Sequence, residues 1–251
     1  MKKTLEITTK IGCANDCFFC PQSQLRAAYK SDVRLMALDD FCRVLDKLPP
    51  DLRIDFSGFT EPFFNSSCAA MISEVRSRGF ELHLYTTLMG MRKEDVRVLT
   101  DSKPDFVRIH VPDKKGLILA DAQWIAQHEL WRMTNLPTYY MAMGETTPAV
   151  QSYLSGLGVV VDLMPMLSRG GLLWDPGKHK GKIACLMNRW HQNVLLPDGT
   201  VVGDCMDYAM TVRLGNLFTQ SYSEIFETAE KWRLSDHSND ICSVCEWATS
   251  A

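Results

Sequence analysis

The sequence has little that would direct the chain to a membrane or to nucleic acid. Among its 251 residues no run approaches the roughly 18 apolar residues of a transmembrane helix. Residues 1–8 alternate polar and apolar side chains and lack the apolar segment of a signal peptide. The net charge of −3 provides no basic excess for binding nucleic acid. We therefore expect a soluble, cytoplasmic protein without membrane or nucleic-acid partners.

Cysteine, in contrast, is abundant, with nine residues in the chain. Without a signal peptide, this number points to a reducing compartment rather than to a disulfide framework. Cys13, Cys17 and Cys20 form a C-x3-C-x2-C run. Three thiolates on one loop can hold three irons of a [4Fe-4S] cluster and leave the fourth iron open to another ligand. Structural zinc usually takes four ligands, and this loop has no obvious local fourth.

From Lys3 to about Leu163 the chain alternates strand-like and helix-like segments, which predicts an α/β fold. Strands are expected at residues 5–9, 53–57, 81–86, 106–111, 138–143 and 159–163. Apolar residues at helical spacing predict helices at residues 39–48, 68–78, 92–99, 122–133 and 147–154. Such units in a row imply a parallel sheet with right-handed crossovers, too short for an eight-unit barrel of about 250 residues. Ligands of such sheets bind at the carboxyl ends of the strands, and the cysteine run follows the first strand.

The pattern changes after about Pro165. Residues 168–182 read as a crossing loop, residues 194–202 as a hairpin with Pro-Asp-Gly at its turn, and residues 222–232 as a short helix. We therefore expect two domains, residues 1–165 and a small α+β domain at residues 166–251. The second domain contains four cysteines that could close around one metal centre: Cys185, Cys205, Cys242 and Cys245. Ligand number alone leaves zinc and an iron-sulfur cluster open for this centre.

The cysteine run, with Phe19 before its last cysteine, resembles the signature of the radical S-adenosylmethionine (SAM) enzymes. Residues 196–205, 214–217, 222–226 and 242–245 resemble the SPASM/Twitch extension of that family, in its short, four-cysteine Twitch form. The resemblance implies a partial (β/α)6 TIM-like barrel followed by a Twitch-type auxiliary cluster domain. It further implies SAM on a [4Fe-4S] cluster held by Cys13, Cys17 and Cys20. A second [4Fe-4S] cluster would be held by Cys185, Cys205, Cys242 and Cys245.

The ends of the second and third strands provide candidate SAM-binding residues. Residues 58–62, Gly-Phe-Thr-Glu-Pro, resemble the Gly-Gly-Glu-Pro segment that binds the SAM amino group in the family. Carboxylate and carbonyl oxygens at a strand end can accept hydrogen bonds from an ammonium group, although Glu61 could equally begin the next helix. Thr86 lies where the family often has Thr-Asn-Gly, but the asparagine and glycine are absent here. The expected cofactor-binding residues are Phe19, Gly58, Thr60, Glu61 and Thr86.

His110 and Arg169 are the candidate catalytic residues. His110 ends the fourth strand, where it could face the substrate or be a hydrogen-bonded core residue. Arg169 could bind the SAM carboxylate or an anionic or hydroxylated substrate, because a guanidinium group suits bidentate recognition. A surface arginine in a flexible loop is the alternative. Cys42 and Cys68 fit core positions, because free cysteine packs as a small hydrophobic residue.

Within the Twitch group the chain resembles the 2-deoxy-scyllo-inosamine dehydrogenases. This resemblance implies an oxidoreductase in which a 5′-deoxyadenosyl radical takes hydrogen from a small molecule such as a sugar or cyclitol. The auxiliary cluster would accept the remaining electron, and a flavodoxin or ferredoxin would be the reductant. An epimerase, which would need a hydrogen donor such as Cys42 or Cys68, and a peptide-modifying enzyme are alternatives. A non-catalytic iron-sulfur or zinc-binding module is the alternative from a different class.

Overall fold

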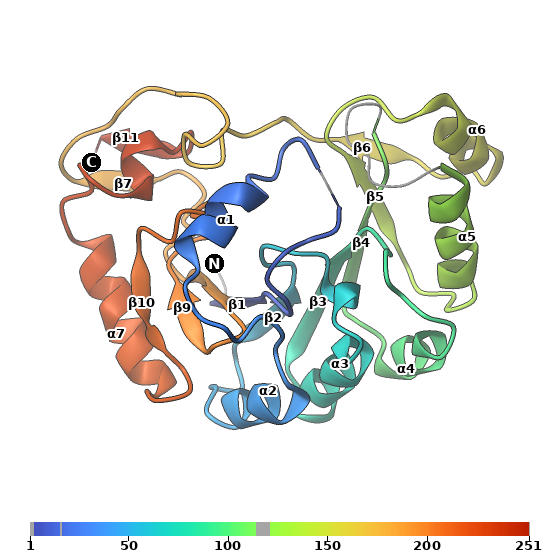
Figure 1. The fold of residues 1–251 in the computed structure, drawn as a ribbon, viewed down its shortest axis with the longest axis horizontal. Coiled ribbons are helices and arrows are strands. Elements are labelled where there is room, and N and C mark those ends of the chain that lie inside the picture. The colour runs from blue at the N-terminus through green and yellow to red at the C-terminus, as the bar shows by residue number, and fades with distance from the viewer. Residues whose placement is uncertain (1–2, 16, 114–120, 251) are drawn as a thin grey trace.

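The computed structural model describes residues 3–15, 17–113 and 121–250 (Figure 1). Within these residues, one sheet of nine strands has the order β10-β9-β8-β1-β2-β3-β4-β5-β6. The strands from β1 to β6 follow one another in chain order, and neighbours pair in parallel. Their bounds are β1 (Thr4–Ile7), β2 (Arg53–Phe56), β3 (Glu81–Thr86), β4 (Phe106–His110), β5 (Tyr139–Ala142) and β6 (Val161–Leu163). This confirms the predicted parallel sheet and its partial, open barrel.

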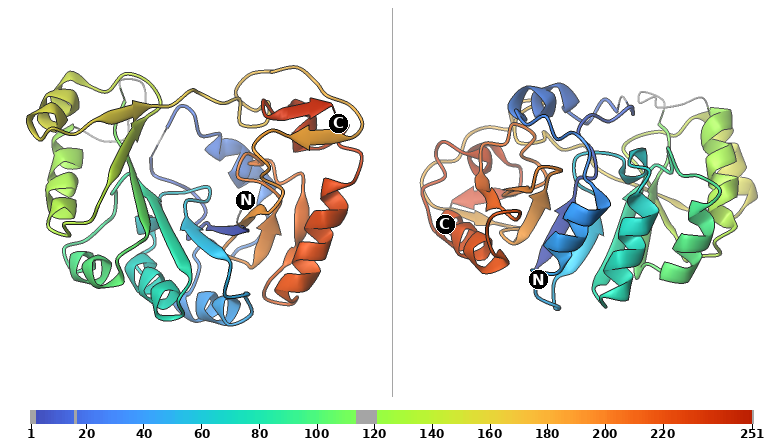
Figure 2. Two further views of the ribbon diagram at one scale, coloured as in Figure 1. Left: turned by 180° about the vertical axis from the view of Figure 1, so that it is seen from behind. Right: turned by 60° about the horizontal axis from the view of Figure 1, so that its bottom comes forward.

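The helices between these strands cover the outer side of the curved sheet, as Figures 1 and 2 show. They are α2 (Leu38–Leu45), α3 (Cys68–Ser77), α4 (Asp95–Ser102), α5 (Asp121–Arg132) and α6 (Pro148–Gly156). Each lies within a few residues of its predicted range. The helix α6 begins at Pro148 rather than at the predicted residue 147, because Thr147 is its N-cap. The Thr147 side chain accepts a hydrogen bond from the backbone N–H of Val150.

The predicted hairpin forms as β8 (Gln192–Leu195) and β9 (Thr200–Val202). It extends the main sheet, because β8 pairs in parallel with β1 and β9 pairs antiparallel with β10 (Arg213–Asn216). The predicted helix follows as α7 (Tyr222–Arg233), which begins with a capping box formed by Ser221 and Glu224. The two-domain division at residue 165 stays a prediction.

A second, two-stranded sheet pairs β7 (Ile183–Cys185) with β11 (Ala248–Ser250). It lies beside the short helix η2 (Ile241–Val244). Another short helix, η1 (Pro62–Phe64), follows β2. Sequence periodicity did not predict β7, β10, β11 or α1 (Gln22–Ala28), because each is short.

Strand burial falls from the centre of the main sheet toward its β6 edge. All residues of β1 are buried, whereas β6, at the edge of the sheet, has two exposed residues. Leu5, Ile54 and Leu82 belong to the core between the sheet and its outer helices. The central strands therefore offer a rigid support for side chains that point into the barrel. No helix among the described residues is long and apolar enough to cross a membrane.

Candidate functional site: two cysteine centres at one cavity

A cavity of about 380 Å³ lies inside the curve of the sheet. Its walls come from the carboxyl ends of β2, β3 and β4, where loops of an α/β barrel build binding sites. The predicted site residues that line it are Cys13, Cys17, Phe19, Cys20, Gly58, Thr60, Glu61, Thr86, His110, Arg169 and Cys205. The predicted ligands Cys185, Cys242 and Cys245 lie outside this lining.

The loop after β1 brings Cys13, Cys17 and Cys20 close together. The backbone N–H of Cys20 donates to the carbonyl of Cys17 over 3.0 Å. The hydrogen bond with the Cys17 thiol and the charge of Arg169 together lower the pKa of Cys20 to about 6, against the opposing effect of burial. All nine cysteines of the chain are free. Three free thiols on one tight loop fit attachment to three irons of a cluster.

The segment after β2 requires glycine at position 58. Gly58 has φ +33°, and a Cβ atom there would lie 2.4 Å from Thr8 Oγ1 and 2.7 Å from the carbonyl oxygen of Ile7. Thr60 follows, and its hydroxyl donates to the carbonyl of Lys10 over 2.7 Å. The segment is thus held against the chain that leads from β1 into the cysteine loop.

Gly58→Ala is therefore expected to destabilise the protein by about 2 kcal/mol, because backbone and side chain must both move to admit the methyl group. Urea denaturation of the apo protein measures this free energy of unfolding. Gly79→Ala is the matched control, because Gly79 also has positive φ but has no atom within 4 Å of the added Cβ. Equal loss in the two variants would contradict the packing argument.

Glu61 is held by the protein itself. Oε1 accepts hydrogen bonds from the hydroxyl of Thr86 (2.7 Å) and the backbone N–H of Phe63 (3.2 Å). Oε2 accepts from both the backbone N–H and the hydroxyl of Thr87, each over 2.6 Å. Burial raises the pKa of this carboxyl, and these donors oppose the rise. Since four donors already surround the carboxylate, Glu61 fastens the Gly-Phe-Thr-Glu-Pro segment to the end of β3.

His110 lies against Phe19 with ring centroids 4.9 Å apart and the rings stacked. Burial and the charge of Arg169 lower the pKa of His110 to about 4. The imidazole is therefore neutral at pH 7 and offers the cavity one donor and one acceptor, without charge.

Arg169 lies between the two groups of cysteines. Its Nε donates to the carbonyl of Phe19 over 3.2 Å, and its Nη1 lies 3.5 Å from the sulfur of Met206, which follows Cys205. Its backbone has φ +53°, a conformation that is uncommon outside glycine. The preceding Ser168 backbone N–H donates to the Glu246 carboxylate. Arg169 thus lines the cavity, in place of the alternative of a surface arginine.

The next two residues explain why this loop contains consecutive glycines. A Cβ atom on Gly170 would lie 1.8 Å from Ile241 Cδ1, and one on Gly171 would lie 3.2 Å from Val244 Cβ. The loop therefore packs directly on η2, the segment with Cys242. This contact with η2 fixes the loop that contains Arg169. The Arg169 side chain in turn reaches the carbonyl of Phe19, in the loop with Cys13, Cys17 and Cys20.

The C-terminal cysteines share one electrostatic neighbourhood. The charge of Asp204 raises the pKa values of Cys205, Cys242 and Cys245, after the larger effect of burial. Cys185 also contributes to the raised pKa values of Cys242 and Cys245. Four free thiols, from β7, the turn after β9, η2 and the residue that follows η2, fit a fully ligated metal centre.

Sequence reasoning missed a polar group at the floor of the cavity. Glu6, Ser57 and Gln192 all line it. The Ser57 hydroxyl donates to Glu6 Oε2 over 2.8 Å, and Gln192 Nε2 donates to Glu6 Oε1 over 2.7 Å. Glu6 lies between two apolar residues of β1 that face the outer core. Because alternate residues of a strand face opposite sides, that pattern places an acid inside the barrel and could have revealed it.

Burial first, and then the charge of Asp55, raises the pKa of Glu6 to about 7. Asp55 is the register neighbour of Glu6 on β2. Its own carboxylate forms two hydrogen bonds with Arg53, at 2.8 and 2.9 Å. Asp55 is thus paired, whereas each oxygen of Glu6 accepts one hydrogen bond from the described residues and keeps a second acceptor position.

Comparison with known proteins gives one match to the C-terminal cysteine segment and further matches to the whole chain. Residues 185–246 match the iron-sulfur cluster-binding domain SPASM, a range that contains the four C-terminal cysteines. A search of curated proteins finds no match. These findings and the structural neighbours below confirm the predicted resemblance to the radical SAM enzymes of the SPASM/Twitch group.

Solved structures match nearly the whole chain at low sequence identity. BtrN in complex with AdoMet and 2-DOIA has a TM-score of 0.64 and 15% identity over 100% of this chain and 94% of its own. The anSMEcpe structure with bound AdoMet has a TM-score of 0.65 and 17% identity over 97% and 83%. SuiB of Streptococcus suis, bound to the precursor peptide SuiA, has a TM-score of 0.68 and 12% identity over 98% and 70%. At these identities the likeness shows a shared fold.

Proposed function

We propose that this protein is a radical SAM oxidoreductase that oxidises a small hydroxylated molecule by two electrons. The observation that carries the proposal is the shared cavity. The loop with Cys13, Cys17 and Cys20 lines it, together with Cys205 of the C-terminal centre. A substrate in this cavity would lie close to both centres. The SPASM match at residues 185–246 and the AdoMet-bound neighbours support the same cofactors.

The chain's own residues fit these cofactors. Cys13, Cys17 and Cys20 would hold one [4Fe-4S] cluster, and Cys185, Cys205, Cys242 and Cys245 the other. When bound, SAM and the two clusters supply a hydrogen-abstracting 5′-deoxyadenosyl radical and a path for the remaining electron. Glu61 and Thr86 hold the segment with Gly58 and Thr60, whose backbone would receive the SAM amino group.

Glu6 gives the cavity a proton acceptor. When a secondary alcohol becomes a ketone, its carbon loses a hydrogen atom, and the electron and the hydroxyl proton leave separately. We assign that proton to Glu6, whose pKa of about 7 suits a base near neutral pH. Ser57 and Gln192 fix the carboxylate and leave one acceptor position on each oxygen.

Arg169 orients the charged or hydroxylated groups of the bound molecules. Its Nε donates to the carbonyl of Phe19, next to Cys20, and its Nη1 lies 3.5 Å from the sulfur of Met206, next to Cys205, so the guanidinium group lies between the cysteine centres. After burial, its charge also lowers the pKa of His110 and so favours the neutral imidazole. We therefore assign binding and orientation to Arg169, and hydrogen bonding without charge to His110.

The epimerase alternative receives less support. Neither Cys42 nor Cys68 is among the described residues that line the cavity. Cys68 is fully buried in the core, and Cys42 lies on the outer helix α2. Neither thiol is placed to return a hydrogen atom to a substrate radical in this cavity.

Reductive cleavage of SAM tests the proposed enzyme class. We expect the anaerobically reconstituted protein, given dithionite and SAM, to form 5′-deoxyadenosine, measured by liquid chromatography. Cys13→Ala/Cys17→Ala/Cys20→Ala should abolish the product, because the open iron would be lost, whereas Cys42→Ala/Cys68→Ala should retain it. A protein with intact clusters that forms no 5′-deoxyadenosine would instead be a non-catalytic iron-sulfur module.

A further inference from the structure

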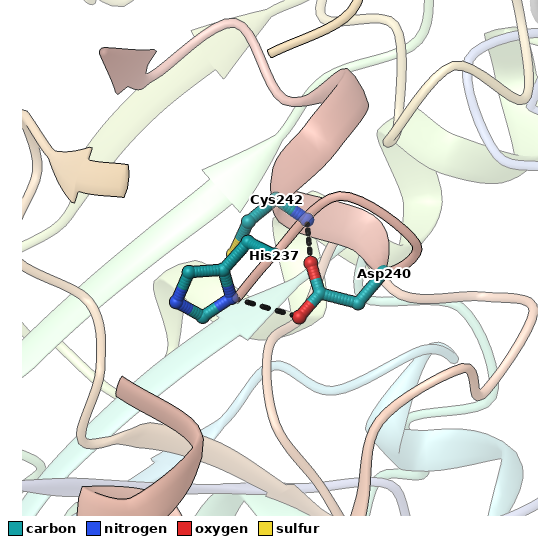
Figure 3. Close-up of side chains that lie close together, drawn as sticks. All are labelled: His237, Asp240 and Cys242. Atoms are coloured by element: carbon teal, nitrogen blue, oxygen red, sulfur yellow. Dashed lines mark hydrogen bonds and ion pairs between the residues drawn. The ribbon is translucent and has the colours of Figure 1, made fainter. Parts of the chain in front are cut away.

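A hydrogen-bonded group lies beside the C-terminal cysteines, outside the cavity. Figure 3 shows its members His237, Asp240 and Cys242, whose ligand atoms all lie within 4.8 Å of one another. Asp240 Oδ2 accepts hydrogen bonds from His237 Nδ1 and Trp232 Nε1, each over 2.8 Å. Asp240 Oδ1 accepts from the backbone N–H of Cys242 over 2.9 Å. Because three donors occupy the carboxylate, the group is a hydrogen-bond network rather than a separate metal site.

The network connects Cys242 to the segment that leads into β7 and Cys185. The backbone N–H of His237 donates to the carbonyl of Gly181 over 3.0 Å. In return, the backbone N–H of Gly181 donates to the hydroxyl of Ser238 over 2.9 Å. His237 is completely buried, so its ring and backbone are both fixed.

Trp232 extends the network from α7 toward Cys205. A Cβ atom on Gly203 would lie 3.1 Å from the Trp232 ring, so the ring packs against the backbone two residues before Cys205. Trp190 completes the packing, with its ring centroid 5.2 Å from those of both Trp232 and His237. The segments that contain Cys185, Cys205 and Cys242 therefore meet at one network.

We propose that Asp240, through His237 and Trp232, is the positioning residue that assembles the auxiliary centre. The inference rests on the proposed function, in which the four C-terminal cysteines hold a cluster. Such a centre needs sulfurs from three separate segments at fixed positions, and Asp240 is the point where these segments are joined. Its carboxylate also places a negative charge near the sulfur of Cys242. Nearby charge and hydrogen bonds set the reduction potentials of such clusters.

The test isolates the auxiliary centre in a Cys13→Ala/Cys17→Ala/Cys20→Ala parent. Asp240→Asn and Asp240→Ala are compared with this parent after anaerobic reconstitution. Iron content, the electron paramagnetic resonance spectrum of the reduced protein and the midpoint potential are measured. Asp236→Asn is the matched control, because Asp236 is an exposed acid in the same loop that accepts a hydrogen bond from Ser238 N–H.

We expect Asp240→Ala to lose more than half of the parent's iron, which should be about four atoms for one cubane. Asp240→Asn should retain it, because the amide oxygen can still accept from Cys242 N–H. Its midpoint potential should shift to a more positive value, since removal of a negative charge favours the reduced cluster. Its spectrum should change as well, and Asp236→Asn should match the parent.

Two outcomes would overturn the inference, and they differ in meaning. If the parent holds iron and both Asp240 variants match its iron content, spectrum and potential, Asp240 does not position the centre. If the parent holds no iron, or zinc instead, the proposed auxiliary cluster itself is wrong. If Asp240→Ala does not fold, judged by circular dichroism, the potential and spectrum of Asp240→Asn decide.

Discussion

Cys185→Ala/Cys205→Ala is expected to lower the iron content of the reconstituted protein from about eight to about four atoms per chain. The two cysteines lie on β7 and in the turn after β9, outside the loop with Cys13, Cys17 and Cys20. The first centre should therefore remain, and SAM cleavage with it. Oxidation of a substrate should fail, because the path for the second electron would be lost. Iron, sulfide and 5′-deoxyadenosine are measured on the same samples.

Cys42→Ala/Cys68→Ala provides the matched control, because it also removes two free cysteines and touches neither centre. It should keep about eight irons. About four irons in the unaltered protein and in Cys185→Ala/Cys205→Ala alike would rule out an auxiliary cluster. Zinc analysis of that protein would then show whether the C-terminal cysteines form a structural zinc site, and redox-neutral radical chemistry would become the leading function.

The parallel half of the fold could be predicted because each of its strands and helices has a strong local pattern. The strand at Glu81–Thr86 matches the prediction at both ends. The C-terminal half depends instead on contacts between distant residues. The hairpin of β8 and β9 is visible in the sequence, but its parallel pairing with β1, nearly 190 residues away, leaves no local signal. The short strands β7 and β11 likewise depend on their pairing with each other, which leaves no local signal in the sequence.

In the candidate site, too, some features could be predicted from local sequence, whereas others depend on contacts between distant residues. Cysteine spacing pointed to both centres, because thiolates are specific ligands. The shared function of Glu61 and Thr86 could not be predicted, since their hydrogen bond joins two strand ends 25 residues apart. Arg169 was recognised as a candidate, but its fixed position results from Gly170 packing on Ile241. Glu6 was missed because the predicted site residues come from cysteine spacing, strand ends and loops, whereas this acid lies inside β1.

Glu6→Gln is expected to remove a pH dependence of stability that amounts to about 3 kcal/mol. Burial first, and then the charge of Asp55, raises the pKa of Glu6 from 4.5 to about 7 in the folded protein. Between these values the folded state keeps a proton that the unfolded state releases. The contribution of Glu6 to the free energy of unfolding is therefore fully present below about pH 4.5 and is lost as the pH rises to about 7.

Urea denaturation of the apo protein between about pH 5 and about pH 8 measures this contribution as the difference between the original protein and Glu6→Gln. The comparison cancels the titration of buried acids that do not interact with Glu6, such as Glu61, which both proteins contain. Glu6→Gln should gain relative stability as the pH rises, since glutamine carries no charge and can retain a hydrogen bond with Ser57. Glu227→Gln, an exposed position on α7, should follow the original protein. Parallel pH profiles for Glu6→Gln and the original protein would show that Glu6 titrates normally, and its assignment as proton acceptor would be withdrawn.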